Sequence, residues 1–464
     1  MIPQFEDNPI APPTEGLGDA LARASAQAIE GSGVLSGPHT RLEIFHGYLG
    51  VFVVAFLVTL LVTPLMRVLA VRNNVVDRPS LSRKIHRRPV AYLGGVAVFL
   101  GLMAGVFFSY IAPYFGPSGT SYFRYHATGF IHPESDMPRP VPISVILGMT
   151  IIMLLGLIDD VVGTLPRLKI AGMFVAAAAL AIDDVGVRVA QGVLSPTLGV
   201  WLNNPELVWR ITLPFPIPIL GAESIPIDLI YWSGTAIIAM AVLGACNASN
   251  LIDGLDGLCT GVTAIAAAGL LIVAITLATQ DYGPRDAQRI ILCMALLGAC
   301  LGFLPHNFNP ATIFLGDAGS LLLGYVSIVI ILTLGDKGET PLVLAGLVMY
   351  AIPIIDTVLA IVRRKLAGKS VSEADDQHLH HMLKRGLGVK GAALTLYGIG
   401  AAFAALGILM SLWQARVIYA MALVAASYIV VTAIKLARRR AWELEEAKVE
   451  PAATVEAPGL PPAP

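Results

Sequence analysis

Long apolar runs alternate with short polar connections between residues 47 and 435. A helix that crosses a hydrocarbon core of about 30 Å needs roughly 20 predominantly apolar residues, and somewhat fewer with favourable flanks. The pattern predicts about 11 transmembrane helices, of which the fourth is cut short by "AIDDVG". They cover residues 47–71, 90–113, 141–158, 168–185, 227–246, 259–279, 288–304, 319–335, 341–362, 391–411 and 415–435.

Composition supports this reading. Hydrophobic residues make up 56% of the chain and charged residues 14%, with a mean hydropathy of +0.73. Because these values lie outside the ordinary soluble range, we expect an all-α polytopic membrane protein whose partners are membrane lipid and a small ligand. The formal net charge of −1 leaves no basic footprint for nucleic acid. Its four cysteines have no metal-ligand spacing, so neither a disulfide framework nor a zinc site is expected.

Three regions follow from the composition along the chain. Residues 1–45 predict a flexible tail, residues 46–436 a single transmembrane domain, and residues 437–464 a charged and then Pro/Ala-rich tail. Within the domain, residues 186–226 alternate β-branched and aromatic side chains between prolines. That segment predicts a short hairpin.

Lys and Arg are concentrated in three connections, at residues 72–89, 363–390 and 435–440. Eleven spans place all three on one side, and short loops rich in these residues stay in the cytoplasm. We therefore expect a multi-pass protein of the cell inner or plasma membrane. Its N-terminus and the hairpin would lie outside, and its C-terminus would be cytoplasmic.

Polar motifs fall on the same predicted side. These are "LIDDVVG", "NASNLIDGLDGL", "HNFNPATIFLGDAGS" and "DDQHLHH", together with the first basic loop. In the second motif Asn247, Asn250, Asp253 and Asp256 follow at a spacing of three. They stack on one face only if the segment tightens to a 3₁₀ helix, and they drift around a regular α-helix. The shared side indicates one common site in cytoplasmic loops.

Carboxylates at the mouth of an apolar bundle are costly unless they are paired, solvated or bound to a cation. With oxygen ligands the natural cation is Mg²⁺, or Mn²⁺, and Mg²⁺ usually shares its shell with substrate phosphates. A phosphorylated substrate is therefore predicted. The carboxylates are Asp159, Asp160, Asp253, Asp256 and Asp317.

Basic and histidine side chains on this side could hold the anionic oxygens that a cation leaves uncovered. Taken singly, each motif also has an ordinary explanation: "IDD" as a solvated helix end, the histidines as a surface loop, and "RKIHRRP" as a membrane anchor. The candidates are Arg83, Lys84, His86, His378, His380 and His381.

Together the motifs resemble the polyprenyl-phosphate N-acetylhexosamine-1-phosphate transferase family (glycosyltransferase family 4), and look most like its WecA/TagO-like branch. The resemblance runs from about Arg72 to Gly388 and keeps the family's order: "DRPSLSRKIHRRPVAYLGG", "LIDDVVG", "NASNLIDGLDGL", "FNPATIFLGDAGS" and "DDQHLHHML". Ala91 stands where the family commonly has Pro, and the interrupted histidines differ from the His-His-His of the muramyl-pentapeptide branch.

The resemblance implies a reaction. A polyprenyl (undecaprenyl) phosphate would attack the β-phosphate of a UDP-N-acetylhexosamine, in the first place UDP-N-acetylglucosamine, and release UMP with Mg²⁺. The product would initiate a lipid-linked glycan for the cell wall or a surface polysaccharide. A homodimer is compatible with this interpretation.

The resemblance also implies residue roles. Asp317 would be the principal Mg²⁺ ligand, Phe314 would lie against uracil, and Asp253 would hydrogen-bond it. Asn250 and Asp256 would line the same cleft. Asp159 is the candidate base for the lipid phosphate, with Asp160 supporting the metal or a lysine; whether Asp159 steers, accepts a proton or acts as a covalent nucleophile stays open. The histidines His378, His380 and His381 would contact the diphosphate, and further substrate contacts would come from Asn247, Lys169, Arg83, Lys84 and His86.

Two other classes of protein remain as alternatives. A multi-span transporter of an anionic solute would place its polar groups near the bilayer midplane, on broken helices and often with repeat symmetry. A CDP-alcohol phosphotransferase would show an Arg and further spaced Asp residues after its first motif, where this chain reads "GLCTGV". Polar groups gathered at one edge favour the transferase.

Overall fold

A computed structural model of the chain describes residues 40–77, 89–115, 141–217, 222–280, 285–366, 368 and 378–413, with scattered positions between 417 and 435. Its helices are α2 (Arg41–Arg72), α3 (Gly94–Phe115), α5 (Ile143–Val162), α6 (Pro166–Ile182), α7 (Gln191–Leu194), α8 (Leu229–Ile252), α9 (Leu258–Ala278), α10 (Asp286–Asn307), α11 (Gly316–Thr333), α12 (Thr340–Met349), α13 (Ala351–Leu366) and α14 (Leu379–Ser411).

Membrane-crossing helices make up most of the described chain. Eight single helices are long and apolar enough to span, and up to ten spans result if each of two bent helix pairs counts as one. These ten coincide with the first ten apolar runs of the sequence, so the all-α polytopic class is confirmed. Most of the eleventh run, residues 415–435, lies outside the described residues, and the count of eleven stays a prediction.

Helix ends depart from the expected spans where local chemistry moves them. α2 begins at Arg41, earlier than predicted, because the Thr40 hydroxyl accepts from the Glu43 N–H while Glu43 accepts from the Thr40 N–H. α6 ends at Ile182, at the polar interruption, and the chain then bends by 84° into residues 187–199. α14 begins at Leu379, so the histidine motif opens a helix instead of lying in a loop, but its backbone is not helical at Gly388 (φ 70°, ψ 179°), which divides it just before the predicted start of the span at 391.

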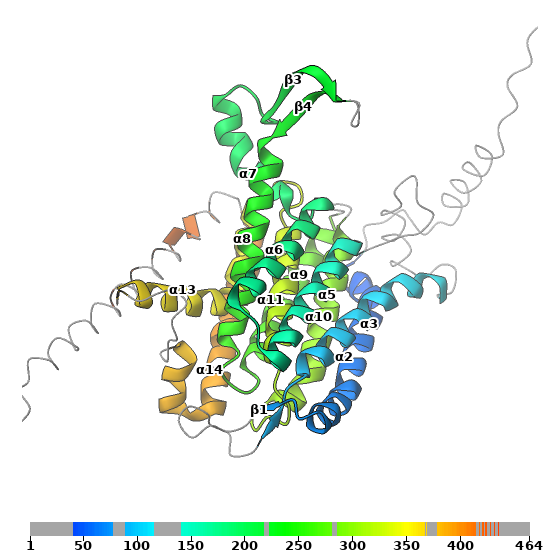
Figure 1. Cartoon of the computed structure of the whole chain (residues 1–464), viewed down its shortest axis with the longest axis vertical. Coiled ribbons are helices and arrows are strands. Elements are labelled where there is room, and N and C mark those ends of the chain that lie inside the picture. Colours follow the sequence, from blue (N-terminus) through cyan, green and yellow to red (C-terminus); the bar gives the residue numbers. More distant parts are fainter. Residues whose placement is uncertain are drawn as a thin grey trace, which may run out of the picture.

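The helices run up and down, so polar connections gather at both ends of the bundle (Figure 1). One end carries the short antiparallel pair β1 (Val76–Asp77) and β2 (Val90–Ala91). At the other end β3 (Val208–Ile217) pairs antiparallel with β4 (Ala222–Asp228), which is the hairpin expected from the sequence.

A buried ion pair fastens the hairpin end of the bundle. Arg289 of α10 contacts Asp286 one turn earlier and donates from Nη1 to the Thr333 carbonyl at the end of α11, at 2.7 Å. Nearby, Arg285 Nε lies 2.8 Å from Asp336 Oδ1. These contacts tie α10 to α11 far from the β1–β2 end.

Small residues let α10 pack closely along α2. A Cβ on Gly298 would lie 2.5 Å from the Phe52 carbonyl oxygen, and one on Gly302 would lie 2.4 Å from that of Phe56. Both distances are below any real contact of a Cβ atom, so only glycine allows this helix separation.

Gly298→Ala should therefore destabilise the folded protein, because the new methyl group forces the backbones of α2 and α10 apart. Overpacking of this kind costs about 1–3 kcal/mol, more than the helix propensity gained. Thermal unfolding in detergent measures the effect as a lower Tm. Gly244→Ala in α8 is the matched control, since nothing lies within 4 Å of its added methyl; an equal Tm for the two variants would contradict the packing argument.

Candidate active site

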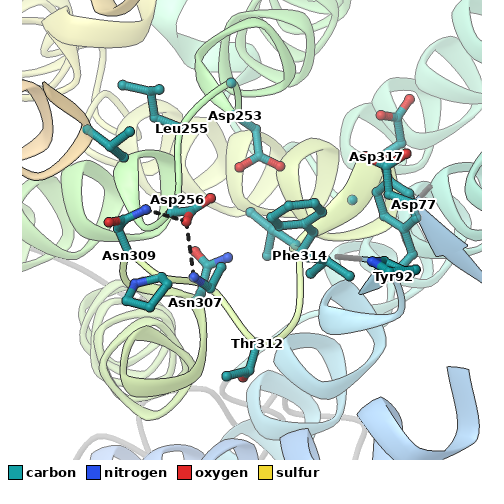
Figure 2. Close-up of a pocket in the computed structure, with 18 of the residues that line it drawn as sticks. Asp77, Tyr92, Asp253, Leu255, Asp256, Asn307, Asn309, Thr312, Phe314 and Asp317 are labelled. Carbon is teal, nitrogen blue, oxygen red and sulfur yellow. Dashed lines mark hydrogen bonds between the residues drawn. The ribbon is translucent and has the colours of Figure 1, made fainter. Parts of the chain in front are cut away.

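A cavity of about 750 Å³ opens at the β1–β2 end of the bundle, within the range of small-molecule sites. Its walls come from the connections α2–α3, α8–α9 and α10–α11 and from the start of α14. Figure 2 shows Asp253, Asp256 and Asp317 around it, with Phe314 between them. Predicted residues in the lining are Asn250, Asp253, Asp256, Phe314, Asp317 and His381.

The motif "NASNLIDGLDGL" is divided between a helix and a turn. α8 continues as a regular α-helix to Ile252, so the polar side chains at a spacing of three do not stack on one face. Asn250 donates to Asp317 Oδ1 at 2.8 Å. Asn247 instead donates to the Leu243 carbonyl at 2.7 Å and is not among the lining residues of this cavity, so its expected contact with substrate stays a prediction.

Lys169 bridges two carboxylates from different helices. Its Nζ lies 2.7 Å from Asp159 Oδ2 at the end of α5 and 2.5 Å from Asp317 Oδ2 at the start of α11. Asp159 Oδ1 also accepts from the backbone N–H and the hydroxyl of Thr164. The bridge draws α5, α6 and α11 together directly behind the cavity wall.

Asp160 has a structural role that the sequence did not reveal. Its two carboxylate oxygens accept from the backbone N–H groups of Asp317 and Ala318, at 2.8 and 3.0 Å. A carboxylate at this place satisfies unpaired donors of the first helical turn and favours the positive end of the helix dipole. Asp160 therefore caps α11 and fixes Asp317, and it is not itself a lining residue.

Asp253 is the carboxylate without a partner. No hydrogen bond or ion pair to its side chain occurs among the residues the structure describes, although it faces the cavity. Burial, and then the charges of Asp317, Asp160 and Asp256, raises the pKa of Asp253 well above its usual range. Burial and nearby carboxylates raise the pKa of Tyr92 in the same way. The cavity therefore has an excess of negative charge.

Asp256 holds the α10–α11 loop. Its Oδ2 accepts from Asn309 Nδ2 at 2.7 Å and from the Ala311 backbone N–H at 3.0 Å (Figure 2). Asn307 completes the arrangement: its amide donates to the Ile313 carbonyl, and its oxygen accepts from the Gly257 N–H. The sequence analysis quoted both asparagines in "HNFNPA" without assigning them, although polar residues beside a predicted site were the available signal.

The aromatic wall is fixed by backbone pairing. The Phe314 N–H donates to the Ala91 carbonyl at 2.8 Å, and the Gly94 N–H donates to the Phe314 carbonyl at 3.1 Å. Tyr92 lies edge-on to the Phe314 ring, with ring centres 5.9 Å apart. Two motifs far apart in sequence thereby place two adjoining aromatic rings beside the carboxylates.

The histidines differ in position. His381 lines the cavity, whereas His378 and His380 are buried behind it. Asp356 of α13 lies 2.8 Å from His378 Nδ1 and 3.7 Å from His380 Nδ1. Asp356 is a functional candidate that lies inside a span and not in a connection; the signal for it was a lone carboxylate inside the apolar run "YAIPIIDTVLAIV".

The expected basic residues Arg83, Lys84 and His86 lie outside the described residues. One cation that the sequence analysis did not assign, Arg67 near the end of α2, lines the cavity. Its positive charge suits an anionic ligand.

Comparison with known proteins gives consistent results. Residues 142–335 match the profile "Glycosyl transferase family 4". The chain is 30% identical over 356 residues to a probable undecaprenyl-phosphate N-acetylglucosaminyl 1-phosphate transferase of Bacillus subtilis, covering 76% of this chain and 82% of that protein. It is 32% identical over 411 residues to decaprenyl-phosphate N-acetylglucosaminephosphotransferase of Mycolicibacterium smegmatis, covering 83% and 87%. A phospho-N-acetylmuramoyl-pentapeptide-transferase of Bacillus cytotoxicus is 35% identical over 195 residues, covering 42% and 56%.

Asp253→Asn should stabilise the protein without ligands. The pKa of Asp253 in the folded protein lies above its value in the unfolded chain, about 3.9. The free energy of unfolding therefore falls as pH rises from about 4 through the raised pKa, because Asp253 loses its proton less readily in the folded state. Asparagine does not titrate, and its advantage therefore grows across that window. We expect a Tm higher by on the order of 2 °C or more at neutral pH, measured in detergent with a chelator.

Asp256→Asn is the control for this prediction, because it removes a carboxylate that already has two donors. Its Tm should not rise. If Asp253→Asn lowers Tm at neutral pH, or if its advantage is the same at pH 4, the unpaired-carboxylate argument is wrong.

Proposed function

The chain belongs to glycosyl transferase family 4, the polyprenyl-phosphate N-acetylhexosamine-1-phosphate transferases, and on this basis we propose that it transfers N-acetylglucosamine-1-phosphate from UDP-N-acetylglucosamine to polyprenyl phosphate. The reaction releases UMP and begins a lipid-linked glycan. Relatives named for this sugar and for undecaprenyl or decaprenyl phosphate support the choice of both substrates. The muramoyl-pentapeptide relative matches a smaller share of the chain.

The observation that carries the proposal is the placement of Asp317. Its carboxylate is held by Asn250, Lys169 and the capped start of α11, yet it lines the cavity. A rigid carboxylate at a helix N-terminus, beside an aromatic wall and at the end of a membrane-spanning bundle, suits a nucleotide from the water and a phosphate from the membrane.

The donor set supports Mg²⁺, or Mn²⁺, at Asp317. The acidic donors that face the cavity are the hard oxygens these ions prefer. Burial, and then the charges of Asp317, Asp160 and Asp256, raises the pKa of Asp253, and a cation would offset that negative charge. Asp317 would hold the ion, while Asp160 would act through its cap on α11. A bound Mg²⁺ would neutralise charge on the transferred phosphate oxygens.

The chain's own residues orient the reactants. Phe314 offers its ring to the uracil, and Asp253 offers a hydrogen-bond acceptor beside it. Lys169 places a positive charge between Asp159 and Asp317, where it favours the anionic phosphates. Because Asp159 is already bound by Lys169 and Thr164, we assign it a steering role and not that of a covalent nucleophile.

In the transfer step, an oxygen of the polyprenyl phosphate forms a bond to the β-phosphorus of the donor, and the bond from that phosphorus to UMP breaks. Phosphoryl transfer mainly requires in-line positioning and charge neutralisation. A phosphate monoester has a second pKa near 6, so the acceptor needs little deprotonation at neutral pH.

Orientation follows from the substrates and from the basic connections. We place the cavity end of the bundle in the cytoplasm of a cell whose inner or plasma membrane holds the protein, with the N-terminus and the β3–β4 hairpin outside. The basic connection at residues 72–89 supports this arrangement. A homodimer stays a prediction.

A transporter is less well supported. Its substrate site would be expected near the bilayer midplane, whereas the cavity lies among helix ends on one side of the bundle. No described feature of the cavity favours transport of a solute over a transferase reaction.

Purified protein should release UMP from UDP-N-acetylglucosamine when undecaprenyl phosphate and Mg²⁺ are both present. Asp317→Asn should lower kcat by about 100-fold or more, since it removes the carboxylate that would hold the cation beside the transferred phosphate. Release of UMP is followed by chromatography, and other UDP-sugars are compared under the same conditions.

Asp184→Asn is the control variant, because Asp184 is exposed at the hairpin end and has a φ of 53° that asparagine also tolerates. It should keep wild-type kcat. Folded protein that releases no UMP with any UDP-sugar would contradict the transferase proposal and favour transport.

A further inference from the structure

Asp356 is a carboxylate inside an apolar helix, only 1% exposed. It lies on α13, which follows α12 after a bend of 81°. Both of its oxygens are engaged: Oδ2 accepts from His378 Nδ1 at 2.8 Å, and Oδ1 accepts from the Leu379 backbone N–H at 2.8 Å. A buried charge with two charge-assisted hydrogen bonds is strongly oriented.

These contacts join α13 to the first turn of α14. His378 stands at the N-cap of α14 but makes no side-chain cap hydrogen bond of its own. Asp356 supplies the missing acceptor from another helix, together with the negative charge that a helix N-terminus favours. The start of α14 is therefore placed by α13 as well as by its own sequence.

The tautomer of His378 follows from this pairing. An ionised carboxylate only accepts hydrogen bonds, so His378 Nδ1 must donate to Asp356. The second ring nitrogen, Nε2, then has the lone pair when the ring is neutral. Asp356 thus fixes both the direction and the protonation pattern of this imidazole.

The rings of three histidines lie next to one another between Asp356 and the cavity. The rings of His378 and His380 are nearly parallel at 13°, with centres 5.4 Å apart, and those of His380 and His381 are 4.3 Å apart. His380 fills the space beside Gly254, where a Cβ would lie 2.4 Å from its Nε2. Only His381 reaches the cavity lining.

We propose that Asp356 is a positioning residue of the transferase: it holds His378 and the start of α14 so that His381 faces the substrate phosphates. The proposal rests on the proposed function, because His381 is assigned to substrate only through it. Asp356 touches no substrate itself.

A metal ion held by Asp356, His378 and His380 is the competing explanation, since their ligand atoms lie within 4.8 Å of one another. The geometry favours positioning. The 2.8 Å separation of Asp356 Oδ2 and His378 Nδ1 is a direct hydrogen bond, and the other carboxylate oxygen is bound to a backbone N–H.

Asp356→Asn tests the proposal with a side chain of the same shape. The asparagine oxygen still accepts from the Leu379 N–H, but its amide points a second donor at the His378 N–H, which must turn or change tautomer. We expect kcat for UMP release to fall by about 10-fold to 100-fold. KM for UDP-N-acetylglucosamine and Tm should change little.

Asp228→Asn is the control, because Asp228 is also a helix-capping carboxylate, here as the N-cap residue of α8, and accepts from the Tyr231 N–H at 2.9 Å but at the hairpin end. It should leave kcat unchanged. If the two variants have the same kcat, Asp356 is only a helix cap and the proposal is wrong.

A double-mutant cycle with His381→Gln tests the route. If Asp356 acts through His381, adding Asp356→Asn to His381→Gln should lower kcat little further. Additive losses would overturn the proposal. The proposal would also be overturned if wild-type protein carried a metal ion that resists a chelator and the Asp356→Asn variant lacked that ion.

His378 offers a second test should Asp356→Asn not fold. His378→Asn keeps a donor near the place of Nδ1, so it should retain more kcat than His378→Ala; equal losses would overturn the proposal. Wild-type protein that releases no UMP would remove the proposed function and this inference with it. An active wild type with unaffected Asp356→Asn would remove the inference alone.

Discussion

The Lys169 bridge between Asp159 and Asp317 is the interaction on which the site depends. It brings one positive charge between two carboxylates at the ends of three apolar helices, where unpaired charge is expensive. Without it, α5 and α11 would meet as like charges. With it, Lys169 offsets the repulsion between Asp159 and Asp317, and Asp317 stays beside the cavity. The negative charge that Lys169 does not offset is available to a cation and its substrate.

The five carboxylates of the polar motifs consequently divide into two groups. Asp160 caps α11, Asp256 holds the α10–α11 loop, and Asp159 is bound by Lys169 and Thr164. These three build the site. Asp253 and Asp317 line the cavity, as Asp256 also does; burial, and then the charges of Asp317, Asp160 and Asp256, raises the pKa of Asp253. A cavity with these carboxylates suits a cation together with the anionic groups that the cation binds.

Sequence reasoning could identify the apolar spans, the convergence of the motifs and the family, because apolar length and ordered motifs are local properties. It could not place the Asn247 amide, which donates to the Leu243 carbonyl of its own helix. Nor could it separate capping carboxylates from ligand-facing ones: Asp160 meets its partners across 157 residues of sequence. Contacts between distant helix ends depend on tertiary packing, which no single motif encodes.

The same dependence explains why Asp356 matters to a site it does not touch. A straight span from Thr340 to Leu366 would carry this carboxylate along the bundle axis; the 81° bend between α12 and α13 instead directs α13 across it (Figure 1). There, Asp356 meets the start of α14. Because α14 would otherwise begin without a side-chain cap, the bent helix sets where the helix bearing His381 starts. The break between α12 and α13 thus helps to fix a side chain of the cavity lining.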